Sequence, residues 1–146
     1  MLDKDVPEKY YLSERIKPTI LSNGTGGFKS NSEINQMIAR PLTATMAKMH
    51  RACQDNYYTE DFLKSADPIE YLKQEFSKDE LATKRIRKLT PEEAFELQGF
   101  SKNIVKGARS IGISEHQLYK EAGNAASVNV IYAILYYLFE VVGVLR

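Results

Sequence analysis

Hydrophobic positions in the C-terminal part of the chain recur at helical spacing, and capping residues divide them into four segments. Thr90 is a good N-cap, Pro91 suits the first turn, and Glu93 completes a capping box. Glycines are placed to end the first three segments. The pattern therefore predicts helices over residues 90–99, 103–109, 114–123 and 125–142.

The last of these helices is apolar around most of its circumference, with a core stripe from Ile131 to Val142 and valines and tyrosines over much of the rest. Residues 125–145 are long enough to span a membrane. They also contain Ser127, Asn129 and Glu140, so we expect a buried helix and no membrane span. This short chain offers little to cover such a helix, which indicates a missing partner surface.

Patterns in the first 85 residues are weaker. Residues 7–21 predict a short helix that ends or bends before Pro18, and residues 22–27 predict a loop. Residues 38–50 alternate like a strand, although a helix from Thr45 onward is an open alternative. One further short helix is expected near residues 68–76. The fold class is predicted to be α+β, with a small irregular β-rich region followed by a helical cluster.

Composition excludes several classes of site. The net charge of +1 argues against a strongly basic nucleic-acid binder, but the charge is segregated: residues 40–51 and 81–89 are basic, and residues 52–80 are acidic. Cys53 stands alone, which excludes an internal disulfide and a multi-cysteine metal site and fits a reducing cytoplasm. The loop at 22–27 lacks the strand and the Lys-Ser/Thr of a phosphate-binding loop. We predict no metal site.

Two blocks in the C-terminal part resemble the last two motifs of DNA cytosine-5 methyltransferases. The first is Arg87-Lys88-Leu89-Thr90-Pro91-Glu92-Glu93-Ala94-Phe95-Glu96-Leu97-Gln98-Gly99-Phe100, and the second is Gln117-Leu118-Tyr119-Lys120-Glu121-Ala122-Gly123-Asn124. Upstream, Tyr10-Tyr11-Leu12-Ser13-Glu14 is similar to the segment that enters the family's target-recognition region. Ala39-Arg40-Pro41-Leu42-Thr43 is similar to the segment that closes it, with Pro41 where threonine is common.

The resemblance implies roles for particular residues. Gly123, Asn124 and Ala125 would lie beside S-adenosylmethionine, and Arg87 and Glu93 would organise the penultimate motif. The DNA-binding candidates are Arg40, Thr43, Thr45, Lys48, His50 and Arg51, with Lys84 and Arg85 behind them, because basic and hydroxyl side chains suit phosphates and base edges. Residues 1–85 would form the DNA-binding target-recognition region. Residues 86–146 would form the C-terminal helical segment, which would complete a Rossmann-like methyltransferase fold.

The family's chemical motifs are not found in this sequence: the Pro-Cys loop, the Glu-Asn-Val glutamate, the Gln-x-Arg-x-Arg segment and the cofactor-binding Phe-x-Gly-x-Gly turn. We therefore expect no catalytic residue here and no activity without a catalytic methyltransferase subunit or N-terminal half. The expected role is the DNA-recognising part of a split restriction-modification-type enzyme, in the cytoplasm of a prokaryote or a phage-infected host. An inactive remnant and a stand-alone DNA-binding or scaffold module are the alternatives.

Overall fold

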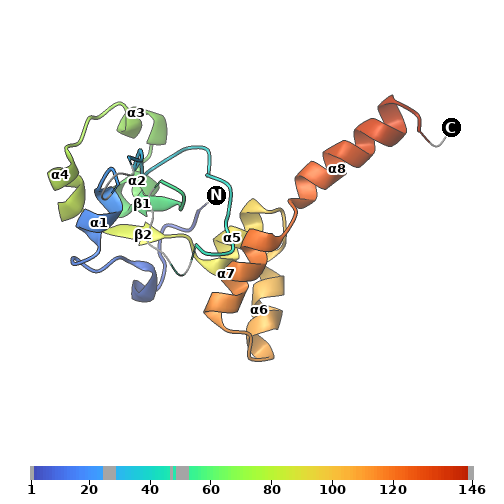
Figure 1. The fold of residues 1–146 in the computed structure, drawn as a ribbon, viewed down its shortest axis with the longest axis horizontal. Coiled ribbons are helices and arrows are strands. Elements are labelled where there is room, and N and C mark those ends of the chain that lie inside the picture. The colour runs from blue at the N-terminus through green and yellow to red at the C-terminus, as the bar shows by residue number, and fades with distance from the viewer. Residues whose placement is uncertain (1, 25–28, 47, 49–52, 145–146) are drawn as a thin grey trace.

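A computed structural model describes residues 2–24, 29–46, 48 and 53–144. Figure 1 shows an N-terminal half of short elements, a cluster of three helices, and a last helix that projects away from both. The N-terminal half contains η1 (Glu8–Tyr10), α1 (Lys17–Leu21), β1 (Tyr57–Thr59), α2 (Glu60–Lys64), α3 (Pro68–Leu72), α4 (Lys78–Thr83) and β2 (Ile86–Lys88). The C-terminal part contains α5 (Pro91–Leu97), α6 (Lys102–Ser110), α7 (Glu115–Asn124), α8 (Val128–Tyr136) and the π-helical η2 (Tyr137–Val141).

A two-stranded antiparallel sheet organises the N-terminal half. β1 pairs with β2 so that Tyr58 lies opposite Arg87, and Tyr11 forms an isolated bridge with Arg87 from the other side. Because β2 is buried and paired on both edges, it holds together segments that are far apart in the sequence. The hydrophobic core around this sheet consists of Leu12, Ile20, Leu21, Tyr57 and Ile86.

Several predictions for this half are wrong. Residues 38–46 form turns and irregular structure instead of a strand, and the residues that would decide the helix alternative lie largely outside the described part. Pro18 lies in the first turn of α1, where its missing N–H costs nothing, so it begins a helix instead of ending one. The region 1–85 is also not β-rich, because β1 is the one strand within it among the described residues.

Capping chemistry explains why the polar stretch contains more helix than expected. The helix predicted near residues 68–76 is confirmed as α3, which Asp67 caps through the amides of Ile69 and Glu70. α2 and α4 were missed although both carry N-caps, Thr59 and the capping box of Ser77 with Glu80. Apolar periodicity does not reveal helices of five or six residues, and in these two the caps were the stronger signal.

The helical cluster follows the prediction closely. α5 begins at Pro91 with the capping box of Thr90 and Glu93, and Gly99 after it has φ of +86°. α6, capped by Ser101, and α7 pack against α5 around Ala94, Phe95, Val105, Leu118 and Ala122. Leu42, from the N-terminal half, packs against this core and also against the core of Tyr58, Phe62 and Leu89. One leucine therefore connects the two halves.

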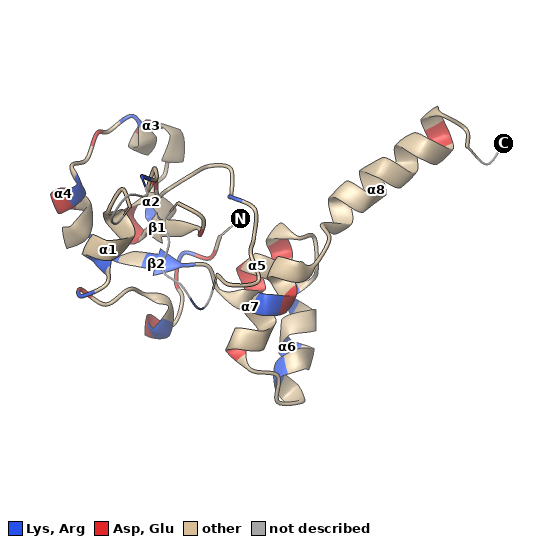
Figure 2. Cartoon of the chain, in the orientation of Figure 1, with Lys and Arg blue, Asp and Glu red and all other residues tan. Residues whose placement is uncertain are grey.

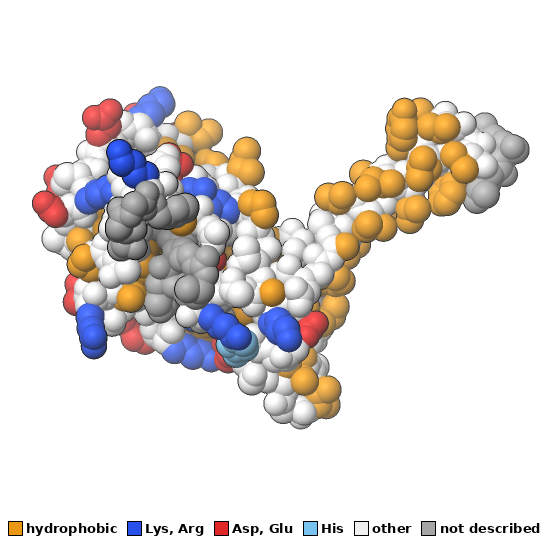
Figure 3. All heavy atoms as spheres, viewed as in Figure 1, with side chains coloured by type: hydrophobic (Ala, Val, Ile, Leu, Met, Phe, Trp, Pro, Cys, Tyr) orange, Lys and Arg blue, Asp and Glu red, His pale blue; other side chains and the backbone are white. Residues whose placement is uncertain are grey.

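The expectation that the last helix is buried is wrong for this chain. None of the residues of α8 and η2 is buried, and their apolar side chains form the orange arm in Figure 3. Within the described residues, the stretch 115–141 is also long and apolar enough to cross a membrane by length and composition. Only 6% of its most apolar 18 residues is buried by the rest of the chain. Length and composition are shared by helices that pack on proteins, so they do not decide what covers this arm.

Candidate functional site

A buried ion pair fixes the penultimate motif. The Arg87 side chain donates to Glu93 through two parallel hydrogen bonds of 2.7 and 2.8 Å, and both side chains are fully buried. Glu93 also accepts from the Thr90 amide at 2.8 Å, while Arg87 donates to the carbonyl oxygens of Lys88 and Asp3. Such a pair is favourable only when its remaining polar atoms are satisfied. Most of them are, although Arg87 Nε has no partner among the described atoms.

Gln98 fastens the two motifs to each other. Its side-chain amide donates to the carbonyl oxygens of Ala122 and Ala125, at 3.0 and 3.3 Å, and its backbone carbonyl oxygen accepts from the Val128 amide at 2.8 Å. The last carbonyls of α7 and the first amide of α8 would otherwise be unpaired. Gln98 therefore sets the angle at which the chain leaves α7 and enters α8.

Gly123 is where the last motif meets the N-terminal half. A Cβ at this position would lie 2.2 to 2.3 Å from backbone atoms of Thr43 and Ala44. Only glycine allows this approach, since real Cβ atoms are not found so close to another backbone. The space beside the Gly123 α-carbon is therefore filled by this chain's own backbone.

Asn124 and Ala125 follow Gly123 at the C-terminal end of α7. Asn124 is the last residue of α7, is exposed, and its carboxamide has no hydrogen-bond partner among the described residues. Ser127 caps α8 without a side-chain hydrogen bond, so the amides of its first turn, apart from that of Val128, have no capping partner. An unpaired amide side chain beside free backbone donors fits one wall of a site for a polar ligand with a carboxylate.

The DNA-binding candidates occupy the segment 40–48, which is anchored at its start. The backbone of Arg40 donates to and accepts from the Asn56 side chain at 2.8 and 3.1 Å. The Arg40 guanidinium lies 3.8 Å from Glu33, whereas Thr45 and Lys48 are exposed. Thr43 is half-buried, with its hydroxyl 3.4 Å from that of Thr45. His50 and Arg51 lie outside the described residues.

Lys84 and Arg85 form ion pairs with acidic residues of this chain. Lys84 Nζ lies 2.8 Å from Asp61, and Arg85 pairs with Glu60 at 3.4 Å and with Glu8. In Figure 2 blue and red segments lie next to each other around β2 and the helices beside it. Two cations of the basic segment 81–89 thus pair with Glu60 and Asp61 of the acidic segment before it, which the sequence alone did not reveal.

A polar cluster that the sequence analysis missed joins η1 of the N-terminal half to α6 and α7. Arg109 on α6 bonds to Glu92 and to Glu115, and Glu115 accepts from the Tyr10 hydroxyl at 2.7 Å. Burial raises the pKa of Tyr10, and the bond to Glu115 raises it further. Burial opposes ionisation of Glu115, but hydrogen bonds from Tyr10 and Arg109 outweigh it and lower its pKa. The partners are up to 105 residues apart, so no local pattern could have indicated the cluster.

Comparison with known proteins settles the family. The family model for C-5 cytosine-specific DNA methylase matches residues 1–140. The chain belongs to this family. Two relatives of the chain are the orphan methyltransferase M.Rho11sI of Bacillus phage rho11s, 52% identical over 50 residues, and the type II methyltransferase M1.ScrFI of Lactococcus lactis subsp. cremoris, 44% identical over 62 residues. These segments cover 34% and 42% of this chain.

The chain spans only part of the proteins it matches. The two segments represent 10% and 15% of the respective relatives. A solved structure of Entamoeba histolytica methyltransferase EhMeth superposes on this chain with a TM-score of 0.67 and 22% sequence identity. The superposition includes 97% of this chain and 39% of the EhMeth chain. At that identity the likeness concerns the fold alone. The described residues contain no cluster of three or more His, Cys, Asp or Glu that could hold a metal ion.

Proposed function

We propose that this chain is the C-terminal part, or a separate subunit, of a DNA (cytosine-5) methyltransferase. Residues 1–85 would recognise the DNA target, and residues 86–146 would complete the S-adenosylmethionine site on a catalytic half that these 146 residues do not include. Family membership supports the reaction type. The observation that carries the division of labour is the exposed apolar arm formed by α8 and η2.

The arm supports a docking role because its exposure is extensive and continuous. Ile131, Leu135 and Tyr136 are 45%, 43% and 55% exposed, and Val141 is 61% exposed. A contiguous apolar surface of this kind on a folded chain marks an interaction site. Since Gln98 fixes the entry to α8, a partner that covers the arm would also be positioned against Asn124.

For the cofactor, the candidate contacts are the Asn124 carboxamide and the backbone amides near Ala125. S-adenosylmethionine supplies the methyl group when it is bound. The residues of this chain would orient it: Asn124 presents an unpaired amide, and the first turn of α8 offers N–H donors to a carboxylate. Gly123 would act indirectly, by letting Asn124 lie next to the segment 40–48.

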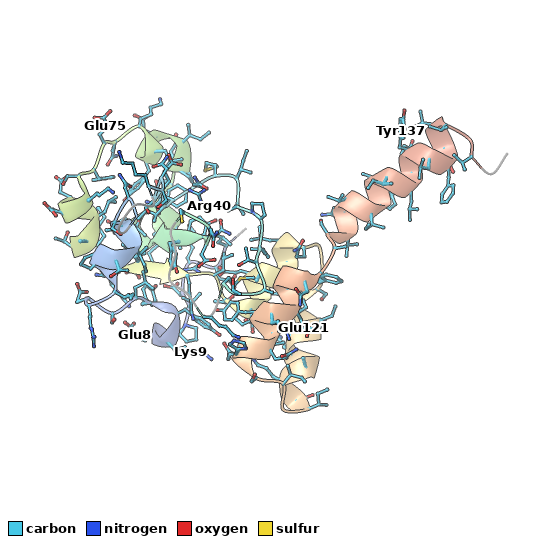
Figure 4. The ribbon with its side chains drawn as sticks, in the orientation of Figure 1. Glu8, Lys9, Arg40, Glu75, Glu121 and Tyr137 are labelled. Carbon is cyan, nitrogen blue, oxygen red and sulfur yellow. The ribbon has the colours of Figure 1, made fainter. Side chains whose placement is uncertain are left out.

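For DNA, the proposal rests on the segment 40–48. Thr45 and Lys48 are exposed and close in sequence, so both can reach a phosphate backbone, while Arg40 is held by Asn56 at the base of the segment. In Figure 4 Arg40 lies between the N-terminal half and the helical cluster. Phosphate contacts of this type position a protein on the duplex without reading its sequence.

The test is methyl transfer from labelled S-adenosylmethionine to mixed-sequence duplex DNA. The chain would be assayed alone and together with a chain that bears the Pro-Cys loop and the cofactor-binding turn. We expect activity only in the mixture, and we expect Asn124→Ala to reduce it. Asn103 on α6 is exposed as well, and Asn103→Ala serves as the matched amide control.

The other outcomes are equally informative. Activity from the chain alone would contradict the claim that its chemistry lies elsewhere. Silence in both assays, with circular dichroism showing a folded protein, would favour the alternative of an inactive remnant or a DNA-binding or scaffold module.

A further inference from the structure

The structure contains a hollow of about 560 Å³ whose charged lining is exclusively basic among the described residues. It lies between the segment that follows η1, the start of α1 and the end of β2. Lys9, Arg15 and Lys88 supply the charge, and the hydroxyls of Ser13 and Thr19 line it as well. None of these residues belongs to the segment 40–48 considered above.

Two of the three cations are not neutralised within the described part of the chain. Arg15 is exposed and has no ion pair there, and the adjacent Glu14 is taken up by Lys17, at 2.6 Å. Lys88 is half-buried, has no ion pair among the described residues, and lies over the Tyr119 ring at 5.2 Å. Lys9 is shared, because its Nζ lies 3.3 Å from Glu115. Figure 4 shows Lys9 beside Glu8 on η1, at the bottom of the N-terminal half in this view.

Lys88 is the unusual member of the group. Burial lowers its pKa, the nearby Glu115 opposes this shift, and Lys9 adds to it. A half-buried ammonium without a carboxylate partner is costly. A bound anion would remove that cost and would be held by charge-assisted hydrogen bonds.

One residue of the hollow, Lys88, also lies near the segment 40–48. Lys88 lines a second, smaller cavity together with Pro41, Leu42 and Thr43.

We propose that this hollow binds a phosphate group through Arg15, Lys88 and Lys9. The phosphate can come from the backbone of duplex DNA or from a free phosphate compound, since both present the same oxygen atoms to the cations. The DNA source rests on the function proposed above, whereas the free source does not.

The experiment uses the full chain and compares Arg15→Gln with Lys106→Gln. Lys106 on α6 is exposed and has no ion pair among the described residues, so its variant removes the same charge elsewhere. Duplex binding would be measured by fluorescence anisotropy over a range of salt, with two unrelated sequences. Inorganic pyrophosphate binding would be measured by calorimetry. Lys88→Gln is the second variant, with thermal unfolding to show that each protein is folded.

We expect Arg15→Gln to weaken binding to both duplexes equally. We also expect it to reduce the slope of log K against log salt concentration by about 1, with no such change for Lys106→Gln. Unchanged duplex binding with loss of pyrophosphate binding would also support the site, with a free phosphate compound as its ligand. If Arg15→Gln and Lys88→Gln match Lys106→Gln in both assays, the proposal is overturned.

Failure of this proposal can be told apart from failure of the proposed function. Methyl transfer in the mixture that is insensitive to Arg15→Gln, with unchanged DNA and pyrophosphate binding, would remove only the phosphate site. Arg15-dependent pyrophosphate binding by a chain that is silent in the methyl-transfer mixture would keep the site and remove only the methyltransferase role.

Discussion

At the scale of single residues, identical residue types have opposite consequences according to what lies beside them. Gly123 and Gly107 are both inside helices, where glycine is intrinsically unfavourable. The Cβ position of Gly123 is occupied by the backbone of Thr43 and Ala44, whereas nothing lies within 4 Å of the Cβ position of Gly107. Helix propensity favours alanine at both sites, so packing alone separates them.

The pair Gly123→Ala and Gly107→Ala tests this difference. We expect Gly123→Ala to lower the free energy of unfolding by about 1–3 kcal/mol, because the backbone must move away. Gly107→Ala should raise it by up to about 1 kcal/mol through helix propensity. Urea denaturation measures both. Equal stabilisation by the two substitutions would show that the close approach of α7 to residues 43 and 44 does not exist.

Two arginines that flank the same strand residue also differ in environment. Arg87 is fully buried against Glu93, whereas the Arg85 side chain is 51% exposed in its pairs with Glu8 and Glu60. Removing one partner of a buried pair leaves an uncompensated charge, and an exposed pair contributes little.

Arg87→Met should therefore lower the free energy of unfolding by about 3–5 kcal/mol. Arg85→Met should change it by no more than about 1 kcal/mol. Thermal and urea unfolding check the difference. The double variant Arg87→Met with Glu93→Leu removes the unpaired carboxylate and should recover much of the loss, and a double variant no more stable than Arg87→Met would contradict this explanation.

At the scale of elements, the arm formed by α8 and η2 differs from the other helices of the C-terminal part. α5, α6 and α7 share a core, but α8 has no buried residue and is attached through Gln98 and the residues before Ser127. Its apolar side chains contribute little to the stability of this chain because folding does not remove them from water. They are available to a partner.

Ile131→Gln tests the arm. We expect the unfolding temperature to stay nearly unchanged and partner-dependent methyl transfer to fall, because a polar side chain would enter the proposed interface. Ile111→Gln is the matched control, since Ile111 is 78% exposed at the end of α6 and lies outside the arm. A large loss of stability without loss of partner binding would mean that α8 packs on this chain.

At the scale of the whole molecule, polar contacts hold the N-terminal half against the helical cluster. Tyr10 comes from η1, Arg109 from α6 and Glu115 from α7, and they meet through the bonds described above. Leu42 and Gly123 make the apolar and backbone contacts between the same halves. Ionisation of Glu115 is therefore coupled to the integrity of the interface.

This coupling predicts a pH dependence. The folded-state pKa of Glu115 is lowered, so its stabilising contribution is complete above the ordinary value of 4.5 and is lost as pH falls through the lowered value. Between about pH 6 and about pH 3, the urea midpoint of Glu115→Gln should fall less than that of the wild type. Glu75→Gln, in the stretch between α3 and α4, is the control and should follow the wild type. Parallel curves for the wild type and Glu115→Gln would exclude this role.

The sequence by itself determined the features that depend on neighbours along the chain. The capping box of Thr90 and Glu93 and the glycine after α5 rest on contacts within a few residues, and both were predicted. The boundaries of α6 were predicted to within one residue. The two motifs also sufficed to indicate the family, because their residues are adjacent in the chain. Asn124 and the DNA-binding candidates remain predictions.

Only the tertiary structure decided the features that depend on residues distant in the chain. It replaced the expected strand at residues 38–46 with turns, since that segment packs its Leu42 between two cores instead of pairing with a neighbour. It also placed the backbone of Thr43 against Gly123 and Gln98 against α7. The last helix has a strongly apolar sequence whether it is buried or exposed. What covers such a helix depends on the surrounding surfaces, and none of this chain's other elements buries it.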